Sequence, residues 1–223
     1  MNKHIIISAV VCATAFFCGA QQKRGVIVYS IAAASDYPEM YSEVEQFDKG
    51  QLSLSFDRTG LRSTLEWGGY FSRSTINRKG NDSTLVLMDN GVKQKAVFFT
   101  ADDLPSEQRL ALAKRNVELV DGEKKVLKRP CKKAIVTNAN STETIIWYTP
   151  TIQPLVRKGD YLFESIPGAP LEIITHKGKM QLHFLAEHID GDVDDAKNLF
   201  KMVIPEGFEL QKSLKINPFT HEH

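Results

Sequence analysis

The chain has 223 residues, with 28 lysines and arginines against 27 aspartates and glutamates, so its formal net charge is +1. Hydrophobic residues make up 42% of the chain and charged residues 25%, which is the balance of an ordinary globular protein. This composition excludes a disordered chain and a collagen, and its bulk charge argues against a nucleic-acid-binding protein.

The first twenty residues have the layout of a secretory signal peptide. A lysine precedes an uncharged apolar run from 5 to 17, and small residues follow before polar sequence resumes. The run is shorter than the about 20 apolar residues that a membrane span needs. We therefore expect cleavage of residues 1–20, no transmembrane segment afterwards, and a single domain over 21–223 that is periplasmic or secreted in a Gram-negative envelope. The alternative is a lipoprotein acylated at Cys18, which the bulky phenylalanine before it disfavours.

Cysteine usage fits this compartment. Cys12 and Cys18 lie in the segment expected to be removed, which leaves Cys131 alone and permits no intramolecular disulfide. An unpaired secreted cysteine is more often a buried small apolar residue than a nucleophile, and we expect the same of Cys131.

A strand and a helix open the mature chain. Residues 25–31 are β-branched or aromatic and too few for a helix, which predicts a strand. A helix of about ten residues is expected next, because an aspartate and a proline mark its start and Met40, Val44 and Phe47 share one helical face.

From residue 52 the apolar period changes to two. Leu52, Leu54 and Phe56 alternate with serines, and Leu65 and Trp67 resume the pattern after a turn, which predicts a hairpin with one apolar face. Further strands of an antiparallel meander are expected over 70–78, 84–88 and 92–99.

The second half of the mature chain continues the sheet. A short helix is expected over 104–114, an irregular connection over 149–160 and a terminal helix over 192–202. Residues 121–125 are expected to form a charged loop between two strands. The expected strands are 116–120, 131–138, 144–148, 161–163, 171–175 and 181–185.

These elements predict a mainly β (α+β) fold. We expect a curved antiparallel sheet or half-barrel of about ten strands, with two or three helices on its concave side. Such a sheet can leave a gap that holds an apolar ligand, and the alternative is a filled core. The candidate lining residues are Leu52, Leu54, Phe56, Leu65, Trp67, Trp147 and Tyr148.

Three blocks of residues come in an order that resembles a known family. They are Cys131-Lys132-Lys133-Ala134, Trp147-Tyr148-Thr149-Pro150, and Ser165 to Ile173 with Pro167-Gly168 at its centre. This order resembles the secreted Bacteroidota families called GLPGLI and the domain of unknown function 4412. The resemblance implies a fold like that of the periplasmic lipoprotein carrier LolA, in which an incomplete barrel cups acyl chains beneath helices. It implies a fold more strongly than a task.

The same blocks can be interpreted from their residues alone. Consecutive strand positions face opposite sides, so we expect one of Trp147 and Tyr148 to enter the core and the other to lie at a rim. Pro167 and Gly168 predict a tight corner that sets the strand register, with a ligand-gating loop as the alternative.

No motif predicts a reaction, a metal site or a cofactor. The histidines lack metal-ligand spacing, and no nucleophile elbow, P-loop or dinucleotide fingerprint occurs. The acids of 190–195 start like an EF-hand, but Asp195 stands where glycine is required, so a helix cap explains them better.

Two functional hypotheses follow, and an enzyme is not expected. The first is a non-catalytic carrier or chaperone that holds a lipid, an acyl chain or another apolar ligand in the concave face. The alternative is a structural or protein-interaction module with a filled core, which docks another envelope protein through its sheet edges and the region of Trp147 and Tyr148. Nucleic acid is not an expected partner.

Overall fold

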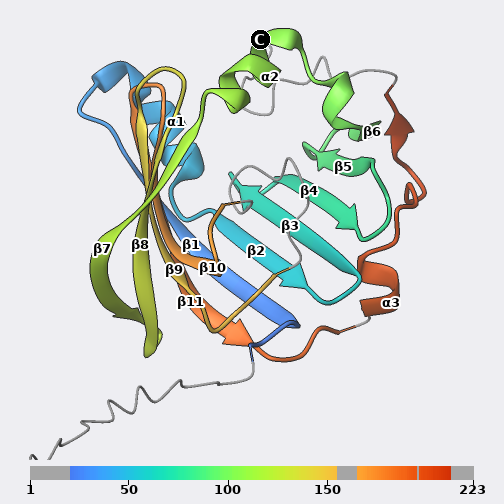
Figure 1. The fold of residues 1–223 in the computed structure, drawn as a ribbon. Helices are drawn as coiled ribbons and strands as arrows, with labels where there is room; N and C mark the ends of the chain where they lie inside the picture. Colours follow the sequence, from blue (N-terminus) through green and yellow to red (C-terminus); the bar gives the residue numbers. More distant parts are fainter. Residues whose placement is uncertain (1–20, 155–164, 195, 212–223) are drawn as a thin grey trace, which may run out of the picture.

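The computed structural model describes residues 21–154, 165–194 and 196–211. Twelve strands form one open, strongly curved sheet, in the order β12-β6-β5-β4-β3-β2-β1-β11-β10-β9-β8-β7 (Figure 1). The pairing of β12 with β6 is parallel, and the other pairings between the named strands are antiparallel. The prediction of a mainly β, curved half-barrel is therefore confirmed.

The strands follow the chain in two runs that meet where β1 pairs with β11. In the first run they are β1 Gly25–Ala34, β2 Gln51–Phe56, β3 Gly60–Trp67, β4 Phe71–Arg78, β5 Thr84–Asp89 and β6 Gln94–Phe99. In the second they are β7 Asn116–Val126, β8 Arg129–Thr137, β9 Glu143–Thr149, β10 Ala169–Lys177 and β11 Met180–Asp190. The short strand β12 Glu209–Leu210 pairs with β6, at the other end of the sheet.

The inner face of the sheet carries the main core. Ile27, Leu54 and Phe56 share this face because β1 and β2 pair Ile27 with Leu54 and side chains alternate along each strand. They belong to the same buried cluster as Val126 of β7 and Cys131 of β8, which lie far away in strand order. The sheet therefore curves until its two halves pack on each other.

The helices lie on both sides of the sheet. The 3-10 helix Pro38–Met40 and α1, Tyr41–Phe47, replace the single predicted helix, and Phe47 packs in one cluster with Trp67 of the inner face. The helix α2, Ser106–Ala113, follows β6 and precedes β7, the two strands near opposite ends of the sheet order. Helix α3, Ala196–Leu199, leads to Phe200, which packs against Gly60.

The chain after α3 covers the outer face of β4 to β6. Met202, Ile204 and Phe208 pack on a cluster that includes Ile76 and Leu85. Gly60 is required where this chain crosses β3, because an added Cβ would lie 2.6 Å from the Cβ of Phe200.

Three sequence-based expectations differ from the structure. Residues 121–125 are not a loop but the second half of β7, which the chain reaches through a bulge after Val120. The terminal helix expected over 192–202 has only the four residues of α3, and the two-residue strand β12 was not expected. The expected signal segment 1–20 and the expected strand 161–163 lie outside the described residues.

Candidate functional site

The residues predicted to line a concave pocket are largely packed. Leu54 is 2% exposed, Phe56 is 0% exposed and Trp67 is 8% exposed, and all three belong to core clusters. Leu52 and Leu65 are half-buried against the same clusters. Side chains buried this deeply leave almost no room for a water-sized group beside them, so the protein's own side chains fill the sheet at Leu54, Phe56 and Trp67.

The second pair of predicted residues divides as the strand alternation requires. Tyr148 is 3% exposed and joins the core cluster of Ile146, whereas Trp147 is half-buried on the opposite side of β9. Pro167 is exposed and Gly168 is buried, immediately before β10. The N–H of Gly168 donates to the carbonyl of Ile166 at 2.8 Å, which fits the predicted tight corner.

The richest group of polar side chains lies at the end of the β7–β8 hairpin. The bulge in β7 puts two residues, Asp121 and Gly122, between the positions paired with Lys133 and Lys132. Gly122 approaches Trp147 so closely that an added Cβ would lie 3.2 Å from the indole ring. The bulge therefore bends the hairpin across Trp147.

Side chains beyond the bulge alternate between two sides of the hairpin. Lys124, Val126 and Cys131 turn inward, where Val126 and Cys131 are buried. Glu123, Lys125, Pro130 and Lys132 are exposed on the other side. The two sides therefore differ in chemistry.

On the inner side a buried carboxylate pairs with two bases. Glu172 of β10 is 7% exposed, forms an ion pair with Lys124, and lies 2.9 Å from His183 Nε2 through its Oε1 atom. The ammonium of Lys124 also lies 4.8 Å from the ring centroid of Trp147, a cation–π distance. This inner ion cluster, Lys124, Glu172 and His183, ties β7 to β10 and β11.

Burial determines the protonation of the groups around this cluster. Burial first, and the positive Lys124 second, lower the pKa of His183, which favours the uncharged imidazole beside Glu172. Burial lowers the pKa of Lys124 and raises the pKa of the Cys131 thiol. Cys131 is a free, buried thiol whose Sγ contacts the carbonyl of Arg129 at 3.6 Å, an environment that does not activate it as a nucleophile.

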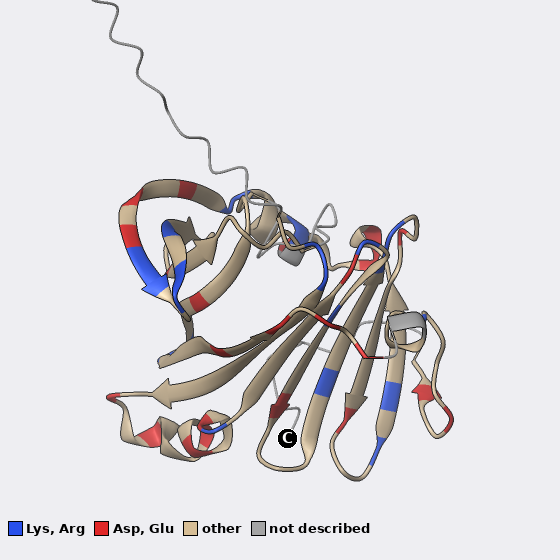
Figure 2. Ribbon diagram, turned by 90° about the horizontal axis from the view of Figure 1, so that it is seen from below, with Lys and Arg blue, Asp and Glu red and all other residues tan. Residues whose placement is uncertain are grey.

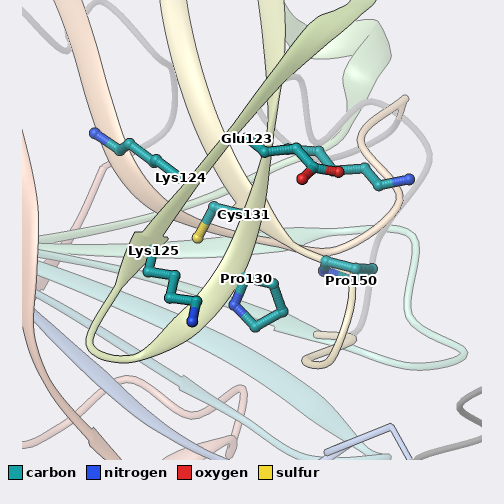
Figure 3. Close-up of a pocket in the computed structure, with 7 residues that line it drawn as sticks. Glu123, Lys124, Lys125, Pro130, Cys131 and Pro150 are labelled. Atoms are coloured by element: carbon teal, nitrogen blue, oxygen red, sulfur yellow. The ribbon is translucent and has the colours of Figure 1, made fainter.

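The hairpin also borders an open pocket of about 290 Å³, which residues from both of its sides line (Figure 3). Its lining residues are Glu123, Lys124, Lys125, Pro130, Cys131, Lys132 and Pro150. We call this the hairpin pocket. The prolines give it apolar walls, while Lys125 and Lys132 place two ammonium groups beside it, with Glu123 directly opposite Lys132 in the strand pairing.

The hairpin is the most basic part of an otherwise balanced chain. Between 123 and 133 the sequence has a single acid, Glu123, and six bases, which are Lys124, Lys125, Lys128, Arg129, Lys132 and Lys133. Figure 2 shows lysine and arginine at the end of β7, beyond the acidic positions of the same strand. The site therefore favours an anionic ligand.

Sequence reasoning named some of this site and missed the rest. The family-motif residues Cys131, Lys132 and Lys133 are all in the hairpin, but Glu172 and His183 were not grouped with them. A glutamate in the middle of the apolar run 169–174 was the available signal, because a charge in such a strand needs a partner. In the described ranges, no three His, Cys, Asp or Glu side chains are grouped so that they could hold a metal ion.

Comparisons with known proteins add a likeness of fold. No family model and no curated protein matches the sequence. Two crystal structures of PNGF-II superpose with TM-scores of 0.50 and 0.49, at 11% and 13% identity, over 87% of this chain and 32% and 33% of theirs. MucB in complex with MucA(peri) gives a TM-score of 0.40 at 14% identity, over 81% of this chain and 55% of that chain.

The likeness to PNGF-II concerns the fold of part of that protein. The chain spans about a third of the length of PNGF-II, and at such low identity the superposition shows a shared mainly β fold alone. Of the helices in the described part of the chain, none has the length and apolar character that crossing a bilayer requires.

Proposed function

We propose that this protein is a non-catalytic binding module of the bacterial cell envelope, and that it binds its ligand at the hairpin pocket. One observation carries the proposal. The hairpin pocket is open and lined by lysines and prolines, whereas the face predicted to hold an acyl chain is filled at Leu54 and Phe56. We also propose an envelope location, from the expected signal peptide, and membership of the GLPGLI or 4412 families, from the order of the three residue blocks.

The chemistry of the hairpin supports binding over catalysis. The buried thiol of Cys131 has a raised pKa, and the carboxylate of Glu172 is occupied by Lys124 and His183. Groups held in this way stabilise a surface and are not available to attack a substrate. The lysines on the outer side are exposed and can meet a ligand.

Site-specific cross-linking in cells tests the proposal. A photo-reactive amino acid replaces Lys132 in the hairpin pocket and, as a matched control, Lys79 in the exposed turn after β4. Irradiation of a Gram-negative host that expresses each variant should give an adduct at position 132 and none at position 79. The mass of the adduct separates a protein partner from a lipid. Equal labelling at both positions, or none at 132, would refute the hairpin pocket as the binding site.

A further inference from the structure

The tip of the β7–β8 hairpin exposes an apolar side chain between basic ones. Leu127 is 41% exposed. It forms the two-residue turn of the hairpin together with Lys128, and Lys125 and Arg129 lie nearby on the two strands. Leu127 and Lys128 have φ of 48° and 64°, in the left-handed region that disfavours such side chains. The turn holds this costly geometry and presents Leu127 at the end of the hairpin.

Some of the basic side chains around Leu127 have partners within the fold, and others are exposed. Lys124 is paired with Glu172, and Arg129 donates to Gln22 at 3.0 Å and to Thr151 at 3.2 Å. The side chains of Lys125, Lys128 and Lys132 are exposed. Three exposed ammonium groups along the hairpin and an exposed leucine at its tip match an anionic lipid surface, which offers negative head groups above an apolar layer.

The N-terminal end of the described chain lies at the same place. Gln22 accepts the hydrogen bond from Arg129 and also forms a parallel bridge with Ile152, close to the hairpin pocket residue Pro150. The segment that precedes Gln22 is the expected signal peptide, or an acylated Cys18 in the alternative. In the alternative, the acyl chain on Cys18 would hold this end of the domain, and the hairpin beside it, at the membrane.

We infer that the β7–β8 hairpin docks on an anionic membrane surface. Leu127 enters the head-group region, Lys125, Lys128 and Lys132 contact lipid phosphates, and one phosphate head group occupies the hairpin pocket. This inference rests on the proposed function, because it names what the hairpin pocket binds. A nucleic acid would match the charge but would offer Leu127 no apolar layer to enter.

Co-sedimentation of the purified protein with vesicles tests the inference. Vesicles of equal parts phosphatidylcholine and phosphatidylglycerol should bind the protein, and pure phosphatidylcholine should not. A basic side chain near such a surface contributes about fivefold in affinity, so Lys125→Gln with Lys132→Gln should weaken binding by about 25-fold. Leu127→Ser should weaken it as well, and high salt should abolish most of it.

A matched control separates the hairpin from total charge. Lys79→Gln with Lys93→Gln removes the same two charges from exposed turns on either side of β5, and its binding should equal that of the wild type. Circular dichroism and the urea midpoint of each variant report that it is folded.

Three results would overturn membrane docking. They are equal loss in the hairpin and control variants, equal binding to neutral vesicles, and binding to soluble polyglutamate without binding to vesicles. If the cross-linker at position 132 traps a protein while no vesicle binds, membrane docking is refuted but ligand binding at the hairpin pocket is supported. If neither occurs, the proposed function fails with it.

Discussion

Substitution of Leu54 tests whether the concave face of the sheet is an open ligand-binding cavity or a packed core. The side chain is 2% exposed and pairs across β1 and β2 with Ile27 in the main core cluster. Leu54→Ala should cost about 2 to 5 kcal/mol of the free energy of unfolding, because it leaves a cavity. Leu54→Lys should cost about 3 kcal/mol or more, because it buries a charge without a partner. A domain stable by about 5 to 15 kcal/mol would lose much of its stability.

Urea unfolding followed by tryptophan fluorescence measures this effect. The control is Gln51→Lys in the same strand, whose exposed side chain points to the outer face and whose stability should stay within about 0.5 kcal/mol of the wild type. If Leu54→Lys folds as stably as Gln51→Lys, the curve is open at this position. The carrier hypothesis would then be favoured again, and bound acyl mass should appear by native mass spectrometry of protein purified without detergent.

Three further predictions concern the turn, the outer face and pH. Leu127→Asn with Lys128→Gly should raise the free energy of unfolding by about 1 to 2 kcal/mol by relieving the left-handed turn, which urea midpoints will show. Gly60→Ala should lower it by about 1 to 3 kcal/mol because it meets the ring packed there, while Gly191→Ala, with no atom within 4 Å, should not. Folding lowers the pKa of His183, so the unfolded chain binds the proton of this histidine more tightly than the folded chain does. The free energy of unfolding should therefore fall as the pH drops below about 6.5, the ordinary pKa of histidine. Between pH 7 and pH 5, the urea midpoint of the His183→Gln variant should therefore fall less than the urea midpoint of the wild type. An equal fall in both proteins would contradict this role of His183.

Local pattern was enough to predict much of the sheet. The alternation of Leu52, Leu54 and Phe56 with serines fixes both the strand and the face that packs, and the structure has β2 with that face inward. The helical spacing of Val44 and Phe47 likewise placed α1 against the core. These features depend on neighbours in sequence, and periodicity reports them directly.

The hairpin could not be predicted in the same way. Residues 121–125 are charged and contain a glycine, which is typical of a loop, and the turn at 127–128 lacks the Asn-Gly signal of a tight hairpin. What makes 123–126 a strand is its pairing with 129–132 and the closure of the bulge onto Trp147, which are contacts between distant segments. Whether the curve of the sheet is filled also depends on how its two halves meet, and no local pattern reports that.

The inner ion cluster and the outer basic surface are two consequences of one register. Because side chains alternate along β7, turning Lys124 inward to Glu172 obliges Glu123 and Lys125 to face outward. A slip of one residue would bury Lys125 without a carboxylate partner and turn Val126 to solvent, so the buried pair selects this register. A buried ion pair often contributes little net stability compared with apolar residues of the same size. We therefore interpret the contact of Lys124 with Glu172 as a specificity device, which determines the lysines that the hairpin presents to its ligand.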